Sequence, residues 1–173
     1  MPDKKFLKTI QDFTARRAVS ASAVRGSRKG TVDACRQFLR NLDLSHFGTV
    51  DKAAFDAALN RTTNRLATRL GSARRKGGVA RKILNIFLRD CFYTCWLRDA
   101  YVLSNAEHLM EMPLDSSTAE NLTDNHKGLP RWRGVRHVDA ALNREYQEAA
   151  LTVADQNDMA RVHLDAKWWS RLD

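Results

Sequence analysis

The segment from residue 79 to about residue 103 constrains the fold most, because it is apolar on nearly every face. It contains the apolar runs 83–88 and 91–97, which are separated by Arg89 and Asp90. A helix that is apolar all round has to be covered on all sides, so we predict that it forms the centre of a helical bundle. The charged residues within the segment argue against a membrane span.

Apolar residues recur at helical spacing on both sides of this segment. Before it, the spacing predicts helices over residues 6–17, 32–42 and 51–70, with Asp51 as an N-cap. After it, we expect helices over residues 105–110, 115–122, 139–155 and 163–172, with Asp115 or Ser116 near the N-cap of the second. Residues 20–30 and 123–138 are expected as loops, the second of them ordered. Because convincing period-two segments are absent, we predict an all-α fold in a single compact domain, residues 1–173.

The charge balance favours a polyanionic partner. Lys and Arg outnumber Asp and Glu by 29 to 20, which gives a net charge of +9. Nucleic acid is therefore the leading class of partner, although a basic stretch can also be simply a solvated helix face. The excess is concentrated between residues 61 and 82, where no acidic residue occurs. The cations there are Arg61, Arg65, Arg69, Arg74, Arg75, Lys76, Arg81 and Lys82.

The cysteines and histidines suggest neither a disulfide framework nor a metal site. Cys35, Cys91 and Cys95 give an odd count without a C-x-x-C motif, and we interpret them as core residues in a reduced compartment. The five histidines lack a metal-ligand spacing, so we expect no metal and no cofactor. Without a secretory signal or an apolar stretch long enough for a bilayer, we expect a cytoplasmic monomer that associates with the nucleoid through DNA and not with a membrane.

The glycine pair Gly77-Gly78 is predicted to form a tight turn that opens the central helix. Glycine can bring backbone N–H groups close to a phosphate, and nearby cations reinforce such a contact. The predicted contacts to the DNA backbone are Arg74, Arg75, Lys76, Gly77, Gly78, Ala80 and Arg81. A lysine on the first turn beyond, Lys82, can attack a sugar carbon, and a nearby carboxylate, Asp115, can steer that attack. Alternatively, Lys82 is one more solvated cation and Asp115 only a helix N-cap.

Three short motifs resemble those of helix-hairpin-helix DNA glycosylases. Residues 77–82, G-G-V-A-R-K, resemble the P-G-V-G-x-K hairpin of that superfamily and depart from it at Gly77 and Ala80. Residues 112–115, M-P-L-D, resemble its V-P-V-D motif, whose aspartate is the essential carboxylate. Residues 163–165, H-L-D, followed by Trp169, are similar to the C-terminal motif of the archaeal 8-oxoguanine DNA glycosylases, as is the interval of 33 residues between Lys82 and Asp115. The resemblance covers residues 74–173, and the helices of residues 3–70 would complete the bundle.

The resemblance implies a glycosylase-like helical bundle with bifunctional DNA glycosylase and AP lyase activity. Lys82 would form a Schiff base with the sugar, Asp115 would orient or deprotonate the amine, and β-elimination would then cut the strand. Trp169 would stack on the extruded base and Asp165 would accept hydrogen bonds from it. Phe87 would complete the base pocket with His163, which we expect to bond to the backbone. The implied substrate is double-stranded DNA with a damaged or modified base, 8-oxoguanine first.

Other functions remain open at this point. One is a non-catalytic nucleic-acid-binding protein that keeps the hairpin and the basic face. Another is a glycosylase that acts on a modified base in foreign DNA with the same lysine and aspartate. A third is a helical protein-interaction or regulatory subunit whose charge is incidental.

Overall fold

All the regular secondary structure in the part of the chain that the structure describes is helical. The structure is a computed structural model, and it describes residues 2–20, 29–71 and 73–169, with the side chains of residues 73–75 left out. No strand occurs among these residues, which confirms the all-α prediction. The longer helices are α1 (Lys4–Ala18), α2 (Thr31–Arg40), α3 (Lys52–Arg69), α4 (Ala73–Tyr93), α6 (Ser116–Asn125) and α7 (Ala140–Asp155). The short segments are η1 (Leu44–Phe47), α5 (Cys95–Ala100), η2 (Leu103–Leu109), η3 (Val135–His137), η4 (Arg161–His163) and α8 (Leu164–Trp169).

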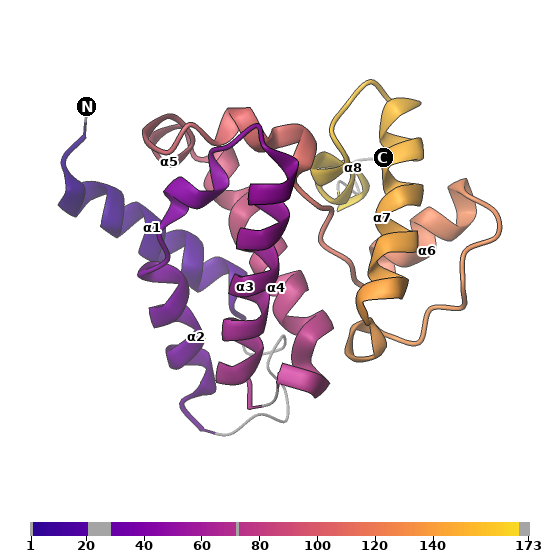
Figure 1. The fold of residues 1–173 in the computed structure, drawn as a ribbon, viewed down its shortest axis with the longest axis horizontal. Helices are drawn as coiled ribbons and strands as arrows, with labels where there is room; N and C mark the ends of the chain where they lie inside the picture. The colour runs from indigo at the N-terminus through magenta and orange to yellow at the C-terminus, as the bar shows by residue number, and fades with distance from the viewer. Residues whose placement is uncertain (1, 21–28, 72, 170–173) are drawn as a thin grey trace.

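Helix α4 is the centre of the larger of two hydrophobic cores, as its apolar sequence predicted. Helices α1, α3 and α5 contact it, and Figure 1 shows α1–α5 together on one side of the molecule. Its side chains Ile83, Leu84, Phe87 and Leu88 are buried in this core. The aliphatic and aromatic side chains of α4 therefore position Lys82, which belongs to the same helix.

The central helix is shorter at its C-terminal end than predicted. It ends at Tyr93, and Thr94 adopts an extended backbone conformation before α5 begins. The Thr94 hydroxyl donates to the Asp90 carbonyl at 2.8 Å, and the change of direction lets α5 bury Leu97 in the larger core. The same break turns Cys95 outward, so the prediction that Cys95 is a core residue is wrong, whereas Cys35 and Cys91 are buried.

The second, smaller core lies between α6, α7 and α8, which Figure 1 shows on the other side of the molecule. Tyr146 and Leu164 are fully buried in it. The chain passes from one core to the other over three residues, since Met110 belongs to the larger core and Met112 to the smaller one. Gln147 of α7 fixes this crossing: its side chain accepts from the Met112 N–H at 3.0 Å and donates to the Met112 carbonyl at 2.8 Å.

Two predicted helix starts are confirmed by their caps. The Asp51 side chain accepts from the N–H of Ala53 at 2.8 Å, at the start of α3. Asp115 caps α6 by accepting from the Thr118 N–H at 3.0 Å, while the Thr118 hydroxyl accepts from the Asp115 N–H at 2.8 Å. This reciprocal arrangement is a capping box, and it fixes the Asp115 carboxylate at the first turn of the helix.

The remaining predicted boundaries hold to within a few residues where the structure describes them. Of the loop expected over residues 20–30, residues 21–28 lie outside the described part, as do residues 170–173 of the expected terminal helix. The helix expected over residues 105–110 is the 3-10 segment η2, and the ordered loop 123–138 contains the single turn η3. None of the described helices has both the length and the apolar character of a membrane span.

The predicted glycine turn is wrong, because Gly77 and Gly78 lie inside α4. The chain instead turns between α3 and α4 at Gly71, which has a left-handed φ of +103°. Gly78 serves a different purpose: a Cβ on it would lie 2.2 Å from the carbonyl oxygen of Val135 and 2.9 Å from the Val138 Cβ. Glycine at this position therefore lets the η3 segment pack directly against the helix backbone.

Candidate active site at the boundary between the two cores

Lys82 and Asp115 meet in the structure. The Lys82 Nζ donates to Asp115 Oδ2 at 3.0 Å, although the two residues are 33 positions apart in the chain. Lys82 comes from α4 of the larger core and Asp115 from the first turn of α6 in the smaller core. Their side chains are 25% and 34% exposed, so the pair is half-buried and still open to solvent on one side. An amine and a carboxylate from different cores are thus in direct contact at the boundary between them.

The two oxygens of Asp115 are used differently. Oδ1 accepts from the Thr118 N–H in the capping box, and Oδ2 faces the Lys82 amine. Burial by itself raises the pKa of Asp115, but the Thr118 N–H and the positive charge of Lys82 outweigh it, so the pKa is lowered. The carboxylate is therefore ionised at neutral pH.

The face of α4 that carries Lys82 continues with Arg89 and Tyr93. Arg89 donates to Asp90 Oδ1 at 2.9 Å and also binds the carboxylate of Asp165 in α8. Residues 82, 89 and 93 fall on one side of a helix, and each reaches a different element of the C-terminal half. The site is therefore a polar seam along α4, between the two cores.

The Asp165 carboxyl is the second acid of this seam. Burial raises its pKa; Arg89 opposes that effect, and the nearby charge of Asp115 raises the pKa further, so the net direction is upward. Because Lys82 and Asp115 both influence it, Asp165 belongs to the same electrostatic site.

His163 is held by side chains and not by the backbone contact that we predicted. Its Nδ1 lies 2.8 Å from the Tyr93 hydroxyl, and its Nε2 lies 2.8 Å from Glu107 Oε1. The rings of Tyr93 and His163 are stacked with their centroids 5.5 Å apart. Both ring nitrogens are engaged, so His163 anchors η4 to the end of α4.

Arg81, which we predicted as a contact to the DNA backbone, is paired with a carboxylate of the protein itself. Its guanidinium forms two hydrogen bonds of 2.8 Å with the two carboxylate oxygens of Glu111, and the side chains of the pair are 15% and 11% exposed. Asn85 and Asn143 also donate to this carboxylate. Burial raises the pKa of Glu111, but the hydrogen bonds and charge of Arg81 outweigh it and lower the pKa. Glu111, which the sequence did not predict as part of the site, joins α4 to the chain crossing at Met110–Met112.

Most of the other predicted site residues are not gathered around Lys82. Phe87 and Ala80 are 0% exposed in the larger core, so Phe87 cannot line a base pocket and Ala80 cannot contact a phosphate. The N–H groups of Gly77 and Gly78 lie in the helix interior instead of in an exposed turn. The Trp169 side chain is 83% exposed at the end of α8. Lys76 is half-buried on α4, and the side chains of Arg74 and Arg75 lie outside the described part.

The loop between α6 and α7 borders the site, a position that was not predicted from its sequence. Trp132 Nε1 donates to Ser116 Oγ at 3.3 Å, immediately beside the Asp115 cap. Arg131 and Arg133 on either side of Trp132 are exposed. The signal available in the sequence was the interleaving of arginine with tryptophan, which is typical of surfaces that bind nucleic acid.

Neither a metal-binding group among the described residues nor a similarity to known proteins adds information about the site. In residues 2–20, 29–71 and 73–169, no group of three or more His, Cys, Asp or Glu side chains is arranged to hold a metal ion. Comparisons of the chain with known protein families, with curated proteins and with solved structures gave no match.

Proposed function

We propose that the protein is a DNA glycosylase with AP lyase activity on a helix-hairpin-helix glycosylase-like bundle, and that Lys82 and Asp115 carry out the reaction. The observation that carries the proposal is the 3.0 Å contact between the Lys82 amine and the Asp115 carboxylate, across the boundary between two cores. Ligand-binding and catalytic sites occur preferentially at such boundaries between packed bodies.

The proposed reaction needs no cofactor. Proton transfer from the Lys82 amine to Asp115 Oδ2 along their hydrogen bond gives the neutral nucleophile, which attacks C1′ of the deoxyribose. The bond between C1′ and the base breaks, and the base leaves with the bonding electrons and takes up the proton that Asp115 received from Lys82, which leaves Asp115 ionised again. The sugar ring opens to a Schiff base with Lys82. Loss of the C2′ proton and of the 3′-phosphate then cuts the strand, and water releases the lysine.

The lowered pKa of Asp115 also suits a second role of a catalytic carboxylate, which is to stabilise positive charge on the sugar. An ionised carboxylate close to C1′ stabilises the positive charge that develops on the sugar as the base leaves. Asp165 and Arg89 lie along the same seam and are proposed to read the extruded base, with the exposed Trp169 at the end of α8 as a stacking surface.

The surface around the site supports DNA as the substrate. The chain has a net charge of +9, and Arg131, Trp132 and Arg133 border the Asp115 cap with cationic and aromatic groups. These residues replace the glycine turn as the proposed contacts to the DNA backbone, together with the basic start of α4 at Arg74, Arg75 and Lys76. The resemblance of residues 163–165 to the archaeal enzymes favours 8-oxoguanine as the base that is excised. A modified base in foreign DNA is the second candidate substrate.

Trapping the Schiff base tests the proposal directly. The protein is incubated with a panel of duplexes that carry 8-oxoguanine, other damaged bases or an abasic site, in the presence of borohydride, and base release and strand scission are scored separately. We expect a covalent adduct that is absent in Lys82→Gln and present in Lys127→Gln, a matched loss of charge at an exposed loop lysine. Asp115→Asn should keep salt-dependent DNA binding and lose activity.

An undiminished adduct in Lys82→Gln refutes the assignment of the nucleophile. If no duplex of the panel gives an adduct while DNA binding persists, the protein is a non-catalytic DNA-binding protein. Weak binding that does not respond to salt points to a protein-interaction role instead.

A further inference from the structure

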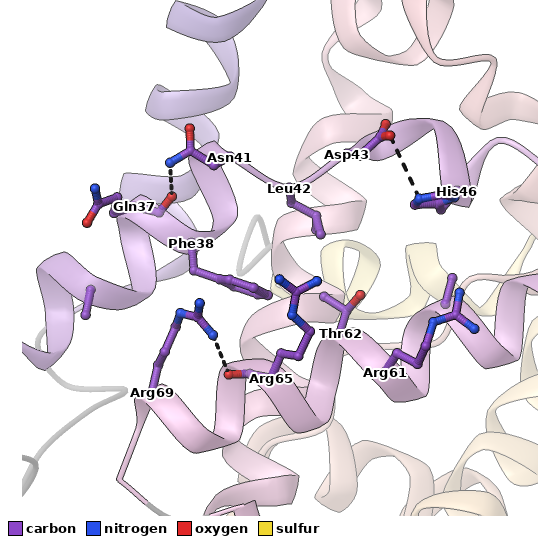
Figure 2. A pocket seen from close by; sticks show the side chains of 12 residues that line it. Gln37, Phe38, Asn41, Leu42, Asp43, His46, Arg61, Thr62, Arg65 and Arg69 are labelled. Atoms are coloured by element: carbon purple, nitrogen blue, oxygen red, sulfur yellow. Dashed lines mark hydrogen bonds and ion pairs between the residues drawn. The ribbon is translucent and has the colours of Figure 1, made fainter.

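A cavity of about 580 Å³ lies between α2, α3 and the segment that leads into η1, away from Lys82. One wall consists of Arg61, Arg65 and Arg69, and Figure 2 shows their side chains rising from α3 on the side that faces α2. Cavities of roughly 300–1,000 Å³ are typical of small-molecule sites. The size and the lining therefore define a candidate binding site, which we term the arginine cavity.

The positive charge of the arginine cavity is not balanced from within. The three arginines follow one another at intervals of four residues, and like charges at this spacing on one helix face destabilise the helix. In the described part of the chain, none of them forms an ion pair with a carboxylate. The only acidic residue of the lining, Asp43, is engaged by the N–H and hydroxyl of Ser45 and faces His46 at 3.8 Å. An anion from solution would supply the missing charge.

Two of the guanidinium groups are held in place before any ligand arrives. The Arg69 guanidinium lies 4.2 Å from the centre of the Phe38 ring and that of Arg65 lies 5.4 Å from it. Arg69 also donates to the Arg65 carbonyl at 2.9 Å, a contact that Figure 2 marks. Arginine binds phosphate through two parallel hydrogen bonds, and a side chain that is already ordered loses less entropy on binding.

The arginine cavity is separate from the candidate active site. On α3, Asn60 and Thr63 face α4, where they accept from Arg81 at 2.7 and 3.3 Å. Residues 61, 65 and 69 fall on the opposite side of the same helix. A duplex bound over Lys82 would have to pass around α3 to reach them, so the anion in question is a different ligand.

We infer that the arginine cavity binds a small soluble anion that carries two or more phosphate groups and is of about nucleotide size. Three guanidinium groups match the charge of a di- or triphosphate. Gln37, whose side-chain amide forms no hydrogen bond with the described residues, and the partly buried Leu42 offer polar and apolar contacts to the rest of the molecule.

Titration calorimetry on the full chain tests this inference, with sodium tripolyphosphate, ADP and ATP as probes. We expect saturable binding of all three, weakened at least tenfold in Arg61→Gln and in Arg65→Gln. Arg65 and Arg69 lie over the Phe38 ring whereas Arg61 does not, so Arg61→Gln removes a charge and leaves those two ring contacts in place. Arg144→Gln, an exposed arginine on α7, is the matched control and should bind like the wild type.

Two results would overturn the inference. One is the lack of specific binding, seen either as no saturable binding of any probe or as equal weakening in the control variant, which would reduce the arginines to a solvated face. The other is duplex DNA of 20 base pairs that displaces tripolyphosphate and loses as much affinity in Arg61→Gln, which would make the cavity part of a DNA surface. Neither result bears on the Lys82 adduct, so failure here is distinguishable from failure of the glycosylase proposal.

Discussion

Alanine at the two adjacent glycines of α4 should change stability in opposite directions. At Gly77 a Cβ meets no atom within 4 Å, so Gly77→Ala gains only helix propensity, about 0.5–1 kcal/mol. At Gly78 the same Cβ would lie 2.2 Å from the Val135 carbonyl oxygen and 3.0 Å from that of Val138. Because these are backbone atoms, the η3 segment has to move as a whole.

The expected difference between the two variants follows from these contacts. Overpacking typically costs about 1–3 kcal/mol, and the gain in helix propensity offsets up to about 1 kcal/mol of it. Gly78→Ala should therefore be less stable than Gly77→Ala by roughly 2 kcal/mol, which corresponds to about 4–8 °C in Tm for a chain of this size. Urea unfolding followed by circular dichroism, with the wild type alongside, measures both changes.

The outcome also separates the two structural interpretations of the glycine pair. If the pair formed an exposed phosphate-binding turn, either alanine would weaken DNA binding and neither would gain stability from helix propensity. Stabilisation by both substitutions, or a Gly78→Ala variant as stable as the wild type, would refute the close packing of η3 on α4.

The Asp115 cap, the pair of Glu111 and Arg81, and the exposed Trp169 each provide a separate test. Asp115→Ala should lose about 1 kcal/mol of stability through the missing cap, whereas Asp115→Asn keeps the cap. Because the folded-state pKa of Asp115 is lowered from 3.8, the stability that its charge contributes should be present above about pH 4 and lost as the pH falls through that lower pKa. Urea unfolding of the wild type and of Asp115→Asn at several pH values measures this loss. Glu111→Ala leaves the guanidinium of Arg81 without its partner and should cost about 3–5 kcal/mol in the same assay, whereas a loss below 1 kcal/mol would mean that water replaces the carboxylate. Trp169→Ala should change the free energy of unfolding by less than about 0.5 kcal/mol while it slows base release in the lesion assay. A large drop in Tm would contradict the exposed position of this indole.

The sequence predicted those features that depend on local chemistry. The apolar central helix and the caps at Asp51 and Asp115 follow from side chains within a few residues of each other, and all three are present. The meeting of Lys82 and Asp115 was predicted from the resemblance of their motifs, and the structure brings them to 3.0 Å.

The features that the sequence did not predict depend on contacts between distant segments. Gly78 is required by a loop 57–60 residues further along the chain, and nothing near Gly78 distinguishes close packing from a turn. Arg81 looked like a surface cation because its partner Glu111 stands alone in the sequence, 30 residues away. The break at Thr94 likewise depends on the packing of Leu97 in the larger core, and the apolar residues on both sides of Thr94 give no local signal for a helix end.

The short crossing from Met110 to Met112 has a consequence for any chemistry at the seam. Lys82, the proposed nucleophile, lies on the larger core and Asp115 on the smaller one, so their alignment depends on how rigidly the two cores are joined. Gln147 holds the connection with both of its amide atoms. A misplacement of about 1 Å can slow a reaction by roughly two orders of magnitude. A substitution of Gln147 that removes these two hydrogen bonds should therefore lower the turnover of the proposed reaction more than the affinity for its substrate.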